Sequence, residues 1–218
     1  MTSKVPVAVF ASGSGTNLQA LLDACADPTF PAEIVVAFSD RPKAYALTRA
    51  EEAGIPTLAV PRKGYGSREE HEEAILKALK PYGPQWLCLA GYMRLLSTPI
   101  LADYPQRILN IHPALLPAFP GLNGQGQAFD HGVRIAGATV HLVDGGTDTG
   151  PIICQGAVPV LAEDDADSLQ QRILKMEHRL YPRALRWAVE GRIHVEGRKV
   201  RLSPTPADPA FDWLNATS

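Results

Sequence analysis

Two polar residues that could take part in catalysis lie close together near the middle of the chain. Asn110 and His112 flank Ile111, follow the apolar residues 108–109, and are followed at once by Pro113. A short apolar run closed by proline is typical of the end of a buried strand. Residues two apart on a strand point to the same side, so both side chains would enter one cleft. An amide N–H donor beside a group that titrates near neutral pH suits a reaction in which charge builds on an oxygen while a proton moves.

His112 could instead be a buried histidine held by its neighbours, which is the more common role of a lone histidine. Its occurrence with Asn110 and with the Pro- and Gly-rich residues 117–127, interpreted as a binding loop or lid, favours a functional site. Asp148, in the tight acidic loop that follows the strand expected at residues 138–143, is the carboxylate that we expect to pair with His112.

Two other residues near Asp148 have open interpretations. Asp144 and Asp148 could both be ordinary turn formers, because Asp-Gly pairs usually mark turns. His141 lies inside the expected strand and is interpreted as a packed residue, or one that supports the site from behind.

The pattern of apolar runs predicts the scaffold that must position these residues. Short apolar runs at residues 5–11, 34–38, 57–60, 86–90, 138–143 and 152–160 are typical of strands, and helical patterns separate the first four. This rhythm predicts an α/β fold with a mostly parallel twisted sheet and helices on both faces, with C-terminal strands partly antiparallel. Ligands of such sheets bind beyond the carboxyl ends of the strands, so the turns at residues 13–17, 93–96 and 110–112 should converge. Pro182 should kink or break the long helical pattern that starts near residue 169.

The turn after the first expected strand reads Ser-Gly-Ser-Gly-Thr-Asn at residues 12–17. Backbone N–H groups at a helix start bind phosphate readily. The turn is not GxGxxG, because Leu18 stands where the third glycine would fall, and no Gly-Lys-Ser/Thr follows as in a Walker A loop. A tight, capped turn without a ligand is the alternative. Further along, Ser67 and Glu70 match a capping box that would start a helix at Arg68.

Composition sets broad limits on the class of protein. The chain has 218 residues, 20% of them charged, and a net charge of −2, so no general attraction to nucleic acid or anionic membrane is expected. Three cysteines without paired spacing favour reduced core thiols, and no apolar run approaches the roughly 20 residues of a membrane span. We expect a cytoplasmic protein with one domain at residues 1–202 and a Pro-rich tail at 203–218. The sequence does not decide the oligomeric state, for which a homodimer is one candidate.

Four motifs together resemble a known family. They are Ser12-Gly-Ser-Gly-Thr-Asn17-Leu, Ala90-Gly-Tyr-Met-Arg94-Leu-Leu-Ser, Asn110-Ile-His112-Pro-Ala-Leu-Leu-Pro and Asp148-Thr-Gly-Pro151. In order and spacing they resemble the folate-dependent phosphoribosylglycinamide formyltransferases of purine synthesis, over nearly the whole chain. Such enzymes have a Rossmann-like fold and transfer the formyl group of 10-formyltetrahydrofolate to the amine of glycinamide ribonucleotide, so the resemblance implies these two small-molecule substrates. No metal is expected, since no step requires one.

The resemblance also implies roles for individual residues. Asn110, His112 and Asp148 would be the catalytic set. The substrate phosphate would lie on Gly15, Thr16 and Asn17, with Glu177 near the glycinamide end, although a solvated glutamate is the alternative for Glu177. The residues implied for the folate site are Arg68, near the anionic glutamate tail, and Met93, Arg94, Leu95, Leu96, Asn110 and Val143.

Related activities remain as alternatives. Formyltetrahydrofolate deformylase replaces the amine with water but has an additional N-terminal domain, for which we expect no room before Val5. Methionyl-tRNA formyltransferase usually adds a C-terminal barrel, and only a short tail is expected here. A non-catalytic folate- or nucleotide-binding regulator is a third alternative, against which the intact catalytic set speaks. One departure is the absence of the histidine that related enzymes commonly have in the loop at residues 121–128, which leaves the contacts of that loop open.

Overall fold

The computed structural model describes residues 3–203 and 211–213, with side chains for residues 3–203. The chain divides into two compact units, and the boundary lies between Asn110 and Ile111. The expected single domain at residues 1–202 is not tested by this division and stays a prediction. Most of the expected tail lies outside the described residues.

The first unit is a parallel sheet in the strand order β3-β2-β1-β4-β5. Its strands are β1 (Val5–Phe10), β2 (Ala32–Ser39), β3 (Thr57–Ala59), β4 (Trp86–Leu89) and β5 (Ile108–His112), whose last two residues belong to the second unit. Its helices are α1 (Thr16–Ala26), α2 (Tyr45–Glu52), α3 (Arg68–Leu79), the 3-10 helix η1 (Lys80–Tyr82) and α4 (Thr98–Asp103). The strand order reverses between β1 and β4, and ligands of open α/β sheets bind at such a reversal.

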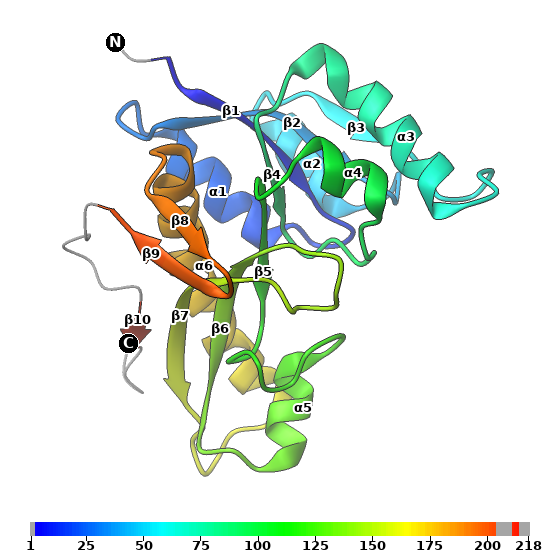
Figure 1. Cartoon of the computed structure of the whole chain (residues 1–218). Coiled ribbons are helices and arrows are strands. Elements are labelled where there is room, and N and C mark those ends of the chain that lie inside the picture. Colours follow the sequence, from blue (N-terminus) through cyan, green and yellow to red (C-terminus); the bar gives the residue numbers. More distant parts are fainter. Residues whose placement is uncertain (1–2, 204–210, 214–218) are drawn as a thin grey trace. The chain divides into compact units, whose positions relative to one another are not determined.

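Burial of the central strands explains why their sequences are apolar without alternation. Residues 7–10 of β1 are 0% exposed, because α1 and α2 cover one face of the sheet and α3 and α4 the other (Figure 1). Strands buried on both faces read as continuous apolar runs. The mostly parallel sheet predicted from the sequence is confirmed.

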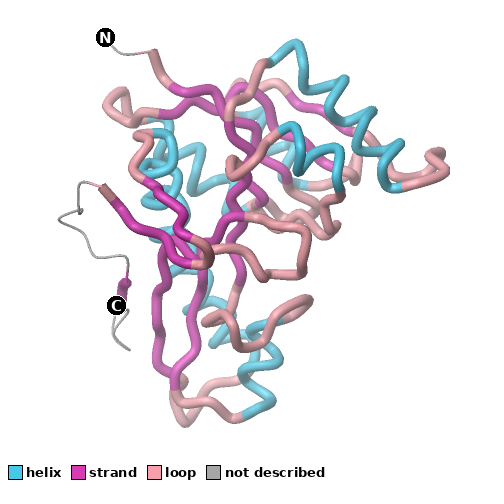
Figure 2. Tube along the Cα trace, viewed as in Figure 1, coloured by secondary structure: helices cyan, strands magenta, loops and turns pink. Residues whose placement is uncertain are grey.

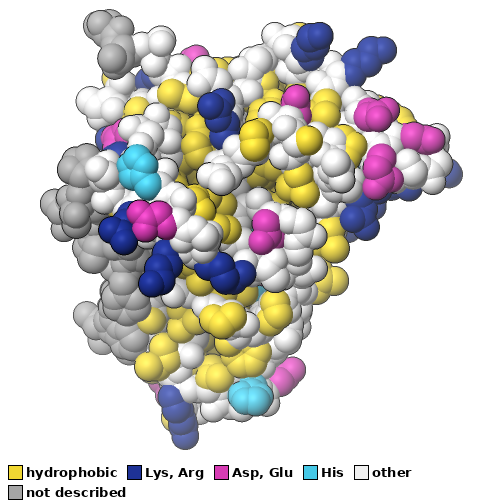
Figure 3. Space-filling model, in the orientation of Figure 1, with side chains coloured by type: hydrophobic (Ala, Val, Ile, Leu, Met, Phe, Trp, Pro, Cys, Tyr) yellow, Lys and Arg dark blue, Asp and Glu magenta, His cyan; other side chains and the backbone are white. Residues whose placement is uncertain are grey.

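Helix α3 begins where the sequence predicts. The Ser67 hydroxyl accepts a hydrogen bond from the Glu70 N–H at 3.1 Å, and the Glu70 carboxylate accepts one from the Ser67 N–H at 3.4 Å. This capping box makes Arg68 the first residue of the helix. Acidic side chains gather on the exposed side of α3 (Figure 3), while Ile75 and Leu79 are buried on its other side.

The second unit contains an antiparallel pair and one long helix (Figure 2). Its strands are β6 (Ile135–Leu142), β7 (Ile152–Pro159), the hairpin β8 (Ile193–Glu196) and β9 (Lys199–Leu202), and β10 (Phe211–Trp213). Its helices are α5 (Gly124–His131) and α6 (Ala166–Val189), and α6 packs against β6 and β7. The antiparallel β6–β7 pair confirms that the later strands are partly antiparallel, while β10 pairs with β7 in parallel.

One expectation for this unit is wrong, and another is met only in part of its terms. The loop expected at residues 117–127 ends earlier, because α5 begins at Gly124. Of the kink or break expected at Pro182, the break is absent, because α6 runs through Pro182 as one helix. A proline inside a helix costs about 3 kcal/mol. Burying one large apolar side chain gains about 1.5–3 kcal/mol, and α6 buries apolar residues both before Pro182, such as Leu180, and after it, such as Leu185.

A buried ion pair fastens the start of α6 to the end of β7. Asp164 accepts hydrogen bonds from both terminal nitrogens of Arg172, with 2.9 Å between Nη2 and Oδ1, and Arg172 also donates to the carbonyl of Pro159. The Asp164 side chain is 2% exposed. The hydrogen bonds from Arg172 outweigh the opposing effect of burial and lower the Asp164 pKa to about 2.

We expect Asp164→Asn to lower the free energy of unfolding at pH 7 by about 2 kcal/mol, since a pKa difference of one unit corresponds to about 1.4 kcal/mol. A carboxyl whose pKa is depressed on folding stabilises the fold above its unfolded pKa, near 4, and this contribution is lost as the pH falls through the folded value of about 2. Thermal unfolding of the variant and the wild type across this range measures the effect. A difference that stays constant from pH 7 to pH 2 would contradict it.

No helix within residues 3–203 and 211–213 has the length and apolar character needed to span a membrane.

Candidate active site

Asp148 lies between two imidazole rings in the second unit. His112 comes from the end of β5, His141 from β6, and Asp148 from the loop that joins β6 to β7. The distance from His112 Nδ1 to Asp148 Oδ2 is 3.3 Å, and from His141 Nε2 to Asp148 Oδ1 it is 3.5 Å. Both rings are buried, whereas the Asp148 side chain is 13% exposed. The expected approach of Asp148 to His112 is therefore present in the structure.

The surroundings of Asp148 keep its carboxylate charged. Burial alone would raise the pKa of Asp148. The hydrogen bond with His141, the N–H of Gly121 at 2.8 Å from Oδ2 and the charges of His112 and His141 together outweigh burial and hold the pKa below its usual range. At neutral pH the site therefore contains a carboxylate in contact with two imidazoles.

The two aspartates of the β6–β7 loop have different roles. Asp144 forms the turn, since its Oδ1 accepts hydrogen bonds from the Gly146 N–H at 3.0 Å and from the Thr149 hydroxyl at 2.6 Å. Asp148 instead has a left-handed backbone with φ of 54° and directs its carboxylate to the histidines. Aspartate tolerates this conformation better than most residues. The turn-former interpretation thus holds for Asp144 and not for Asp148.

The loop at residues 117–123 covers His112. His112 Nε2 lies 2.8 Å from the carbonyl oxygen of Phe119. Both ring nitrogens of His112 therefore face an acceptor, Nδ1 the Asp148 carboxylate and Nε2 this carbonyl. Gly124 allows this close approach, because a Cβ there would lie 2.9 Å from His112 Nε2 and 3.0 Å from the Phe119 carbonyl. A residue larger than glycine at position 124 would therefore disturb the packing around His112.

The sequence did not predict several contacts of this unit. His141 was interpreted as a packed or supporting residue, and it is 2% exposed with Nδ1 2.8 Å from the Leu142 carbonyl, which fixes the ring with Nε2 toward Asp148. Its position on a strand gave no sign of this contact. Glu177, for which solvation was the alternative, is only 6% exposed on α6. Val143 follows β6 and is half-buried.

In the first unit, the glycine turn is held against α2. The N–H of Ala46 donates to the Gly13 carbonyl at 3.1 Å, and Arg49 Nε donates to the Ser14 carbonyl at 2.9 Å. Gly15 is the N-cap of α1 with φ of 73°, so Thr16 and Asn17 open the helix with their N–H groups directed toward its start. A helix start with a fixed preceding turn can bind an anion such as phosphate.

Replacing Gly15 with alanine should therefore disable this turn. A Cβ at Gly15 would lie 2.6 Å from Ala46 Cα, and a positive φ costs an L-residue about 1–2 kcal/mol. We expect the KM for a phosphate-bearing substrate to rise about tenfold or more, measured by steady-state kinetics with the other substrate saturating. Gly13→Ala is the matched control, since no atom lies within 4 Å of a Cβ there. Equal KM values for the two variants would contradict the role of the turn.

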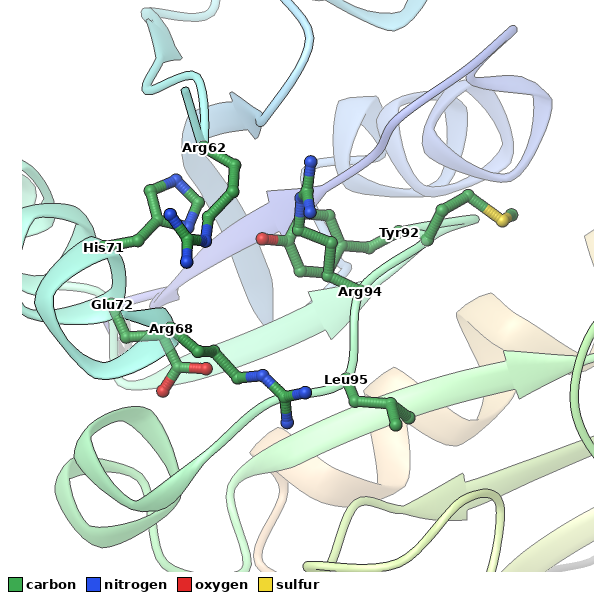
Figure 4. Close-up of a pocket in the computed structure, with 8 residues that line it drawn as sticks. Arg62, Arg68, His71, Glu72, Tyr92, Arg94 and Leu95 are labelled. Carbon is green, nitrogen blue, oxygen red and sulfur yellow. The ribbon is translucent and has the colours of Figure 1, made fainter. Parts of the chain in front are cut away.

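Four of the seven residues implied for folate binding line a cavity in the first unit, whereas Leu96, Asn110 and Val143 do not. Arg68, Met93, Arg94 and Leu95 line a cavity of about 230 Å³ (Figure 4). The other residues that line it are Arg62, His71, Glu72 and Tyr92. Met93 and Leu95 are 55% and 53% exposed, whereas Leu96 is buried and does not line the cavity.

Charges in this cavity favour an anion. Glu72 is 2% exposed and its carboxylate accepts hydrogen bonds from the Ser97 N–H at 2.7 Å and the Ile100 N–H at 3.4 Å, so it caps the start of α4. Arg68 is exposed at the rim, and Figure 4 shows its guanidinium between Glu72 and Leu95. An apolar wall beside guanidinium groups suits a ligand with a flat ring and an acidic tail.

Asn110 lies on β5 and is the last residue of the first unit. It is the last residue of β5 to pair with β4, opposite Leu89, and is half-buried. Ser12 after β1 contacts the segment after β4, since its hydroxyl accepts the Met93 N–H at 3.1 Å. The predicted convergence of the turns after β1 and β4 is thus present.

Comparison with known proteins identifies the class to which this scaffold belongs. The profile of the formyl transferase family matches residues 5–185. The chain therefore belongs to the formyl transferase family, as the sequence motifs predicted.

Individual members of this family can be compared with the chain by identity and coverage. The phosphoribosylglycinamide formyltransferase of Bacillus subtilis (strain 168) is 43% identical over 179 residues, which are 82% of this chain and 92% of that protein. The trifunctional purine biosynthetic protein adenosine-3 of Drosophila melanogaster is 48% identical over 85% of this chain, and the chain spans only 14% of that protein. The crystal structure of glycinamide ribonucleotide transformylase 1 from Symbiobacterium toebii has a TM-score of 0.90 and 51% identity, covering 93% of this chain and 95% of that one.

A formyltetrahydrofolate deformylase from Pseudomonas syringae pv. tomato shares the fold at lower identity. It has a TM-score of 0.85 and 27% identity, covering 92% of this chain and 66% of that chain. The higher identity to the amine formyltransferases favours them over the deformylase alternative.

Proposed function

We propose that this chain transfers the formyl group of 10-formyltetrahydrofolate to the primary amine of glycinamide ribonucleotide, a step of purine synthesis. The observation that supports it best is the contact of Asp148 with His112, in a chain whose relatives include enzymes named for this reaction. The products are formylglycinamide ribonucleotide and tetrahydrofolate.

The reaction needs hydrogen-bond donors for an oxygen that becomes negative. Attack of the amine nitrogen on the formyl carbon forms a C–N bond and leaves a tetrahedral oxyanion. The Asn110 amide and the His112 ring, two residues apart on β5, supply donors of the required kind. The oxyanion would compete with the Phe119 carbonyl for the N–H at Nε2 of His112.

The same histidine can move the proton. The attacking amine must lose a proton and N10 of the folate must gain one as its bond to the formyl carbon breaks, so no proton is consumed overall. His112, oriented by the charged Asp148, can pass the proton directly or through water. His141 supports Asp148 from its other side.

Other residues would bind the two substrates. Gly15, Thr16 and Asn17 would hold the substrate phosphate, and the buried carboxylate of Glu177 would face the glycinamide end. The folate would lie on Met93, Arg94, Leu95, Leu96, Asn110 and Val143, with Arg68 paired to the glutamate tail. The chain would work in the cytoplasm, where its free thiols at Cys25, Cys88 and Cys154 would stay reduced. A homodimer stays a prediction.

Hydrolysis of the formyl-folate is the second candidate, because water in place of the amine would use the same donors and the same relay. The deformylase that shares this fold supports keeping it. The transferase needs glycinamide ribonucleotide for turnover, whereas the hydrolase needs only water.

The experiment follows tetrahydrofolate release from 10-formyltetrahydrofolate by absorbance. We expect release to require glycinamide ribonucleotide and to proceed without ATP and in the presence of a chelator. Release at the same rate without the amine substrate would overturn the transferase in favour of the hydrolase.

A further inference from the structure

A buried carboxylate lies just beyond the end of β2, outside the residues that the proposed reaction uses. The Asp40 side chain is 1% exposed. Its Oδ1 accepts a hydrogen bond from the Ser12 hydroxyl at 2.6 Å, and its Oδ2 accepts one from Arg94 Nε at 2.6 Å. A charge buried to this degree is costly unless it is paired, so Asp40 fixes the side chain of Arg94 as well as being neutralised by it.

Ser12 extends this contact to the backbone of the segment after β4. Its hydroxyl donates to Asp40 and accepts the Met93 N–H at 3.1 Å, and its own N–H donates to the Gly91 carbonyl at 3.1 Å. Residues 91–94 are thus held by one backbone–backbone hydrogen bond, one hydrogen bond to the Ser12 hydroxyl and one ion pair, all within the first unit. The hydroxyl can make both of its contacts at once only while an acceptor lies at Asp40.

The core completes the support of this segment. The ring of Tyr92 packs edge-on against Phe10 and Phe38, with ring centroids 5.4 Å and 6.0 Å away. Met93 and Leu95, the neighbours of these fixed residues, remain more than half exposed along the cavity of Figure 4. The segment therefore presents apolar side chains to a ligand from a backbone that Asp40 holds in place.

Beyond Ser12, the phosphate turn at residues 13–17 has anchors of its own. The carbonyls of Gly13 and Ser14 bond to Ala46 and Arg49 of α2, and neither bond involves Asp40. Loss of the Asp40 charge should thus disturb the segment after β4 much more than the turn at residues 13–17.

We propose that Asp40 is a positioning residue for reduced-folate binding, acting through Ser12 and Arg94 on the segment at residues 91–96. This inference rests on the proposed function, because it takes that segment as the folate site. Asp40 would act from behind this segment, because its side chain is only 1% exposed.

The test is Asp40→Asn, which keeps an acceptor for Ser12 but removes the charge that holds Arg94. We expect the KM for 10-formyltetrahydrofolate to rise about tenfold, while kcat and the KM for glycinamide ribonucleotide, at saturating folate, stay within about twofold of the wild type. A merely structural effect would lower the amount of active enzyme without separating the two KM values. Unchanged folate KM, or an equal rise in both KM values, would overturn the role of Asp40.

Two further variants keep the result interpretable. Asp164→Asn removes another buried carboxylate that pairs with arginine, in the second unit, and should lower stability without changing either KM. Arg94→Gln should raise the folate KM, and the double variant with Asp40→Asn should be no worse than the more severe single variant, because the two residues act through one contact. Additive effects would contradict this coupling.

Failure of the inference and failure of the proposed function are distinguishable. If wild-type protein does not bind reduced folate in a titration of its intrinsic fluorescence, the proposed function fails. If the wild type binds and Asp40→Asn binds equally well, only the positioning role is lost.

Discussion

Replacing His112 with alanine is expected to lower kcat about a hundredfold or more. In the proposed mechanism the substitution would remove both the donor for the oxyanion and the group that moves the proton, and loss of one oxyanion donor alone typically costs 10²- to 10³-fold. The measurement is kcat with both substrates saturating, together with a thermal unfolding curve to show that the variant folds.

His194→Ala is the matched control, because His194 is an exposed histidine of β8 that pairs with Arg201 on β9 and lies outside the site. It should retain wild-type kcat. Near-normal turnover of a folded His112→Ala protein would remove the proposed mechanism.

Asp148→Asn should also lower kcat about a hundredfold or more, with little effect on folding. Asparagine has nearly the same shape and tolerates the left-handed backbone of 54°, so the change removes mainly the negative charge between His112 and His141. An amide in place of a carboxylate leaves the His112 ring without a charged partner at Nδ1.

Asp144→Asn tests whether the effect belongs to the site or to the loop. Asp144 lies in the same loop but accepts hydrogen bonds only within it, from Gly146 and Thr149. It should therefore keep most of the activity. Equal losses in the two variants would mean that Asp148 acts only by shaping the loop.

The pKa of Asp148 sets the pH range in which its charge contributes. Because the pKa lies below that of an ordinary carboxyl, the charge is present above the usual carboxyl range and is lost as the pH falls through the lowered pKa. The loss of kcat that follows protonation of Asp148 should thus appear only in acid, and wild-type activity near neutral pH should not show a titration of this group.

Local sequence signals predicted the scaffold well. The apolar runs placed β1, β2 and β4 to within about two residues, and the Ser67–Glu70 pair placed the start of α3. These features depend on residues close together in the chain, where spacing alone specifies the structure. The approach of Asp148 to His112 was expected from the chemistry that the two residues could share.

Contacts between distant residues were not predictable in this way. No local pattern separates His141 facing Asp148 from a histidine packed in a strand, nor Asp40 paired with Arg94 from an aspartate in a turn. Helix α5 was missed because its two glycines, Gly124 and Gly126, read as loop, whereas the fold places them where side chains would collide. Pro182 was expected to kink or break α6, but the helix is unbroken, because burial on both sides of Pro182 outweighs one lost hydrogen bond.

The fate of the formyl group tests the central claim most directly. Wild-type protein is incubated with 10-formyltetrahydrofolate labelled in the formyl group and with glycinamide ribonucleotide, and the label is separated into formylated nucleotide and free formate. An active site that uses Asn110, His112 and Asp148 for transfer to an amine should place nearly all of the label in the nucleotide, and His112→Ala should abolish that transfer. Label recovered mainly as formate, or nucleotide formylated equally by the wild type and His112→Ala, would contradict the account.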